Sequence, residues 1–147
     1  MKKFHFRLDS VIRYRRYLER AAQIKLGTTE QALINCRKKI DSLGRLRKTF
    51  SNELEHEEKK GMNTGIYQIY KLYIDKIDRD ISSQQQNLKE LITSRDQKRE
   101  ELKSASIQKK SLERLKVIEY SRHKKDFKLF EQNAIDELVL LRKKLIQ

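Results

Sequence analysis

Three histidines and one cysteine are the side chains of this 147-residue sequence that most often carry chemistry, and their spacing predicts no active site. His5, His56 and His123 lie far apart in sequence, and Cys36 has no neighbouring Cys or His with which to bind a metal. The acidic residues within 53–58 would spread over all sides of a helix, which indicates a solvated surface. A glycine-rich phosphate loop is also missing. We therefore expect a non-enzymatic protein without catalytic, cofactor-binding or metal-ligating residues.

Charge is the stronger signal, because the formal net charge is +14. Residues 2–25 carry eight basic against two acidic side chains, and residues 95–128 carry twelve against six. Between them, residues 49–81 are weakly acidic, with five basic against seven acidic side chains. Such a surplus suits nucleic acid, a membrane surface or an acidic protein face. Interleaved acidic residues and the lack of a recognition module argue against nucleic acid, so we expect protein partners.

Long helices must position these charges. Hydrophobic residues at 37% against charged residues at 38% are too few for a compact core of this size, and proline is absent. Two glycines flank Met62, Asn63 and Thr64, a pattern typical of a helix stop followed by a helix start. The sequence thus predicts an all-α fold, two long helices in an antiparallel coiled-coil hairpin with a longer second helix. The expected boundaries are one elongated domain over 1–147, with helices at about 8–60 and 66–146 and a turn at 61–65.

A heptad pattern supports each helix. The first seam has apolar residues at eleven of fourteen positions and one slip before Gly27: Leu8, Val11, Arg15, Leu18, Ala22, Leu26, Thr29, Leu33, Cys36, Ile40, Leu43, Arg47, Phe50 and Leu54. The second has nine of thirteen: Tyr70, Ile74, Ile77, Ile81, Gln84, Leu88, Leu91, Arg95, Lys98, Leu102, Ala105, Lys109 and Leu112. Asp9 or Ser10 should cap the first helix, and Asn63 or Thr64 the second. Pairing from the turn places Leu8 near Ile118.

The helices are unequal, so the second should overhang. Its last segment carries a new apolar stripe that has no partner inside the hairpin: Phe127, Phe130, Ala134, Leu138, Leu141 and Leu145. We expect this stripe, and Phe127, Phe130, Leu138 and Leu141 in particular, to dock another protein. Near the turn, Tyr67 and Tyr73 could join Leu46 and Phe50 in an aromatic patch.

No apolar run is long enough for a secretory signal or a membrane span, and a single cysteine suits a reducing compartment, so we expect a soluble cytoplasmic protein. The Arg-rich start leaves a mitochondrial presequence as a second interpretation.

Several short motifs, in order, resemble those of the FliJ family, soluble components of the flagellar type III export apparatus. They are the run from Phe4 to Ile12 followed by Tyr14, Arg15, Leu18 and Glu19, the turn glycine, the aromatic start of the second helix, residues 110–116 with Tyr120, and the pair Asp136 and Glu137.

The resemblance implies a stalk that inserts into the hexameric ring of the export ATPase, contacts the membrane protein of the export gate and binds export chaperones. It would work in the cytoplasm, peripheral at the inner face of the cell membrane and not inserted. The ring-facing residues would be Arg13, Arg15, Arg16 and Arg20. The gate-facing residues would be Leu43, Leu46, Phe50, Tyr73 and Ile77, along a stripe that includes Lys39, Asp80 and Gln84. A generic coiled-coil adaptor or scaffold is the alternative function, and a nucleic-acid-binding protein is a third.

Overall fold

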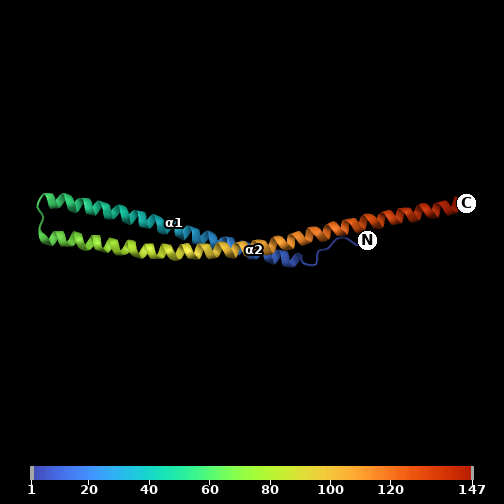
Figure 1. Cartoon of the computed structure of the whole chain (residues 1–147), viewed down its shortest axis with the longest axis horizontal. Coiled ribbons are helices and arrows are strands. Elements are labelled where there is room, and N and C mark those ends of the chain that lie inside the picture. Colours follow the sequence, from blue (N-terminus) through green and yellow to red (C-terminus); the bar gives the residue numbers. More distant parts are fainter. Residues whose placement is uncertain (1, 147) are drawn as a thin grey trace. The chain divides into compact units, whose positions relative to one another are not determined.

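Two α-helices make up almost all of the structure, a computed structural model that describes residues 2–146 (Figure 1). Helix α1 spans Asp9–Lys59 and helix α2 spans Thr64–Ile146, with 51 and 83 residues. No strand occurs in the described part of the chain. The sequence-based prediction of an all-α hairpin with a longer second helix is confirmed.

The turn between the helices is built by one glycine and one asparagine. Gly61 has a φ of 86°, the left-handed region that side chains disfavour, and its N–H donates to the Glu58 carbonyl at 3.2 Å. Asn63 caps the N-terminus of helix α2, because its side-chain Oδ1 accepts a hydrogen bond from the Gly65 N–H at 2.9 Å. Of the two caps that the sequence allowed, Asn63 is therefore the one used.

Replacing Gly61 with alanine should destabilise the turn, because the added Cβ meets a disfavoured φ although nothing lies within 4 Å of it. We expect a loss of about 1–2 kcal/mol in the free energy of unfolding, measured by urea denaturation. Gly27→Ala is the matched control. Gly27 lies inside α1, its added Cβ also meets nothing within 4 Å, and the same change should stabilise the chain by about 1 kcal/mol. Equal effects of the two substitutions would contradict this account.

The chain divides into two compact units. The turn unit comprises Ala22–Leu102, and the terminal unit comprises Met1–Ala21 with Lys103–Gln147. Each unit contains a stretch of both helices.

In the turn unit the two helices run antiparallel, side by side, around a narrow core (Figure 1). Its buried side chains are Leu33, Cys36, Leu54, Ile74 and Ile77. All of them belong to the two predicted seams, including the buried free thiol of Cys36. Arg47 is the one predicted seam residue of the turn unit that is exposed. Its long side chain leaves the core and pairs with Asp78 on the facing helix.

In the terminal unit the core is centred on Phe6 and Ile12, which are 1% and 2% exposed. The prediction that Val11 is the seam residue here was incomplete, because Ile12 is buried and Val11 is half-buried. The expected cap at Asp9 or Ser10 was wrong, since α1 already includes both residues. The Asp9 carboxylate instead accepts from Lys116 of α2 at 2.7 Å. That contact agrees with the predicted register of Leu8 near Ile118.

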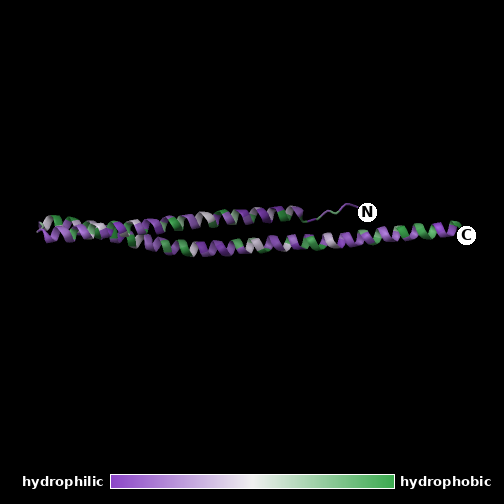
Figure 2. Cartoon of the chain, turned by 90° about the horizontal axis from the view of Figure 1, so that it is seen from above, coloured by the Kyte–Doolittle hydropathy of each residue, from purple (hydrophilic) through white to green (hydrophobic). Residues whose placement is uncertain are grey.

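Helix α2 continues far beyond the last contact with α1 in the terminal unit. Every residue of 124–146 is exposed, so the predicted overhang is present, and we call these residues the C-terminal segment. Apolar and polar residues alternate along it (Figure 2). Within residues 2–146, neither helix has a stretch that is long and apolar enough to span a membrane.

Candidate partner-binding surfaces

Three ion pairs join the helices of the terminal unit. The most enclosed is that of Glu19 with Lys109, at 3.0 Å, with side chains 13% and 19% exposed. The Glu19 carboxylate also accepts from the Ser106 hydroxyl at 2.9 Å. The hydrogen bond from Lys109, with that from Ser106, lowers the pKa of Glu19 from its ordinary value. Glu19 is therefore charged at neutral pH and neutralised by Lys109.

The other two pairs occupy the carboxylates of Asp9 and Glu113. Asp9 binds Lys116, and this hydrogen bond lowers the pKa of Asp9. Glu113 accepts from Arg16 at 3.2 Å. Each of these three acidic residues is therefore paired with a basic side chain of the facing helix. The positive charge that remains on this part of the terminal unit lies on other side chains.

The four arginines predicted to face a ring separate into two groups. Arg15 is half-buried and donates to the Gln108 side-chain oxygen, and Arg16 is held by Glu113, so both contribute to the hairpin itself. Arg13 and Arg20 are exposed, and among residues 2–146 neither has a carboxylate within ion-pair distance.

Tyr17 lies between these two free arginines along the helix. Arg13, Tyr17 and Arg20 follow each other at steps of four and three residues, so they share one face of α1. Tyr17 is 67% exposed. Arginine and tyrosine are the residue types that most often dominate protein interfaces. We call these three residues the Arg–Tyr face.

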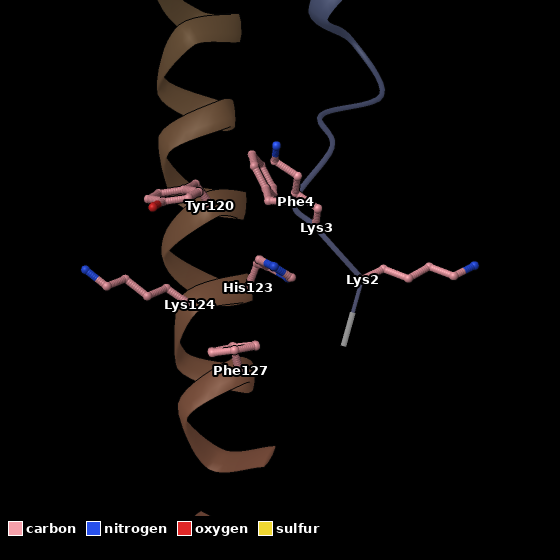
Figure 3. A pocket seen from close by; sticks show the side chains of 7 residues that line it. All are labelled: Lys2, Lys3, Phe4, Tyr120, His123, Lys124 and Phe127. Carbon is pink, nitrogen blue, oxygen red and sulfur yellow. The ribbon is translucent and has the colours of Figure 1, made fainter. Parts of the chain in front are cut away.

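A hollow of about 550 Å³ lies beside the extended residues that precede α1. The Phe4 ring packs against Tyr120 at 5.2 Å and His123 at 5.5 Å between ring centroids, and Phe127 borders the same hollow. Figure 3 shows Phe4 next to Tyr120, with the Lys124 side chain pointing away. The sequence left this contact unpredicted, although the alternation of Phe4 and Phe6 with polar residues was its signal.

The residues predicted to face an export gate differ in accessibility. In the turn unit, Leu46 and Tyr73 are exposed, whereas Leu43 and Phe50 are half-buried. Phe50 packs on Tyr73 at 4.5 Å and on Tyr70 at 6.4 Å between centroids, so part of the expected aromatic cluster is present, with Tyr70 in the place expected for Tyr67. Ile77 is 3% exposed and packs inside the hairpin. A partner can therefore touch Leu46 and Tyr73, whereas Ile77 is buried in the core of the turn unit.

Next to this cluster is a small hollow of about 160 Å³. Its lining residues are Lys39, Leu43, Asp80, Ser83 and Gln84. Three of them, Lys39, Asp80 and Gln84, are the polar members of the stripe predicted from the sequence. The structure thus brings both helices' contributions to that stripe together at one place in the turn unit.

The predicted residues of the C-terminal segment are all exposed. Phe127, Phe130, Leu138 and Leu141 are between 38% and 66% exposed. Phe127 borders the hollow beside Phe4, and the rest of the stripe is exposed.

Comparison with known proteins decides the family. Residues 4–143 match the family model described as flagellar FliJ protein, which covers nearly the whole chain. The chain belongs to the FliJ family. FliJ proteins are non-enzymatic components connected with flagellar export, and the paired helices of this chain fit such a structural role. No curated protein and no solved structure matched the chain.

Proposed function

We propose that this FliJ protein is a stalk that couples the hexameric export ATPase ring to the export gate and binds export chaperones. The match over residues 4–143 carries this proposal, because it spans both helices and not one motif. The protein would act in the cytoplasm at the inner face of the cell membrane. Its contribution would be mechanical. A change in the contacts that one end of the coiled coil makes would be passed along the paired helices to the partner at the other end.

The Arg–Tyr face is the part that would seat in the ring. The ion pairs of Asp9, Glu19 and Glu113 neutralise these three carboxylates beside the start of α1, and this leaves Arg13 and Arg20 to a partner. Arg15 and Arg16 support this seat by holding the two helices together. An acidic surface on the inside of the ring would complement these charges.

The aromatic cluster of Phe50 and Tyr73, with Leu46 and Leu43, would bind the gate. Leu46 and Tyr73 are exposed, and Phe50 and Leu43 are half-buried. Such a group of accessible aromatic and aliphatic side chains is suited to anchor an interface. Phe127, Phe130, Leu138 and Leu141 would serve the chaperones, because an exposed helical stripe can pair with another helix.

Stimulation of the cognate ATPase by the purified chain tests the proposal. We expect intact protein to raise the rate of ATP hydrolysis, and Arg13→Glu with Arg20→Glu to raise the concentration needed for half-maximal stimulation at least about tenfold. The effect should shrink as salt is added, because the contacts are exposed charges.

Lys38→Glu with Lys48→Glu is the matched control. Both lysines are exposed on α1 in the turn unit, so this variant changes the net charge equally. Circular dichroism should show both variants to be helical. If the intact chain does not stimulate the ring, the stalk function is refuted, and if both variants lose stimulation equally, the seat is not the Arg–Tyr face.

A coiled-coil adaptor is the second candidate, and the complete exposure of residues 124–146 favours it. An adaptor would bind partners through this segment without changing ATP hydrolysis. The same assay therefore separates the two functions.

A further inference from the structure

The C-terminal segment has a pattern of apolar and charged residues that complements itself. Its stripe, from Phe127 to Leu145, is flanked by charges of both signs, as a coiled-coil seam is. The other exposed apolar side chains of the segment lie off this stripe: Leu129, Ile135, Val139, Leu140 and Ile146. Since every residue of 124–146 is exposed, this seam is free to pair.

Opposite charges lie at opposite ends of the same flank. Glu131 and Arg142 are eleven residues apart, about three helical turns, so they lie on one side of the stripe. Asp126 and Lys144 are eighteen residues apart, about five turns, and share the other side. In an antiparallel pair of identical helices, each flank of the seam lies beside the same flank of the other copy. The N-terminal end of that flank then meets the C-terminal end of its counterpart. Acidic residues of one copy would then meet basic residues of the other on both flanks.

A hollow on the segment fits the same register. It has a volume of about 240 Å³ and is lined by Glu137, Leu140, Leu141 and Lys144. These four positions have the spacing of the hole that receives one side chain of a facing helix in a coiled coil. When Glu131 meets Arg142, Phe130 of the second copy lies opposite this hollow. Phe127 then lies beside Leu145, and Ala134 beside Leu138.

We propose that residues 124–146 of two copies of this chain pair as an antiparallel coiled coil, with Glu131 of each copy facing Arg142 of the other. A parallel pair is less favourable, because it would set Asp126 of one copy beside Glu131 of the other and leave only the pair of Glu137 with Arg142 attractive. The segment is only about 35 Å long, so the dimer is weak and forms as concentration rises. This inference goes beyond the stalk function and does not depend on it.

Dimerisation would have a consequence for partner binding. A segment paired with a second copy does not offer Phe130 and Leu141 to another helix. Self-association and partner binding through this segment therefore exclude each other.

Sedimentation velocity of the full chain from about 1 to about 100 μM tests the proposal. We expect a shift from monomer to dimer in the wild type. Glu131→Arg alone and Arg142→Glu alone should each stay monomeric over this range, because each places like charges together twice in the dimer. An equimolar mixture of these two variants should dimerise again, since both of its cross pairs are attractive.

The matched control is Asp136→Arg with Lys143→Glu, which exchanges charges on the outer side of the segment and should dimerise as the wild type does. Circular dichroism confirms that each variant is helical. A wild type that stays monomeric overturns the proposal, as do variants that dimerise normally or a mixture that remains monomeric. A monomer that instead floats with phosphatidylcholine vesicles containing phosphatidylserine would show that the stripe binds lipid, which also overturns it.

Discussion

The Phe6→Ala variant is expected to lose most of the structure that ties the residues before α1 to α2. Phe6 is 1% exposed and is the largest fully buried side chain among the described residues. Truncating a buried phenylalanine costs about 3–5 kcal/mol, because contacts are lost and a cavity remains. The terminal unit has few other buried side chains, so repacking cannot compensate for this loss.

Hydrogen exchange read by mass spectrometry measures this effect locally. Amides at the start of α1 and in residues 103–123 should exchange at least about a hundredfold faster in the variant, while those of the turn unit keep their protection. Phe130→Ala is the control, because Phe130 is 56% exposed and its loss should leave exchange unchanged. Unaltered protection in Phe6→Ala would show that the residues before α1 do not stabilise the hairpin.

Periodicity was sufficient to predict the helices and the seams. Of the predicted seam positions in both helices only Arg47 is exposed, and polar members such as Lys98 and Lys109 are half-buried as snorkelling requires. Heptad spacing succeeds because each seam residue depends mainly on its own helix and one facing helix. Arg47 departs from it because Asp78 offers a charged partner at the edge of the seam.

The ends of helices were harder to predict, because there the chain leaves its period. Asp9 has the residue type of a cap, but Lys116 is close enough to bind its carboxylate instead. Phe6 lies outside the first helix, where the only pattern is the short alternation of Phe4 and Phe6 with polar residues. The neighbouring Phe4 packs on Tyr120 of α2, more than a hundred residues away, and so short a local pattern does not predict a contact of that range.

The sequence predicted each candidate surface as a group of residues of one type. The structure shows which members of a group contact the facing helix and which remain available to a partner. Arg15 and Arg16 look equivalent to Arg13 and Arg20 in sequence. Only the facing residues Gln108 and Glu113 distinguish them. To distinguish them one must know which residue of α2 faces each arginine, and this requires the register of the two helices to within one residue. Composition does not give that register.

Substitution of Ile77 should affect the stability of the fold strongly and partner binding little, whereas substitution of Leu46 should do the reverse. Ile77→Ala should lower the free energy of unfolding by about 2–5 kcal/mol in urea denaturation, because its side chain is 3% exposed in the core of the turn unit. Leu46→Ala, at a side chain 37% exposed, should cost less than about 1 kcal/mol.

Binding to the isolated soluble domain of the export gate protein should follow the opposite order. At a temperature where all variants are folded, Leu46→Ala and Tyr73→Ala should each weaken binding about tenfold, since these side chains can reach a partner. Ile77→Ala should bind nearly as the wild type does, because it is covered by its own helices. If Ile77→Ala weakened binding more than Tyr73→Ala while remaining folded, the gate would contact the chain in an opened hairpin, and the exposed cluster of Leu46 and Tyr73 would not be its docking surface.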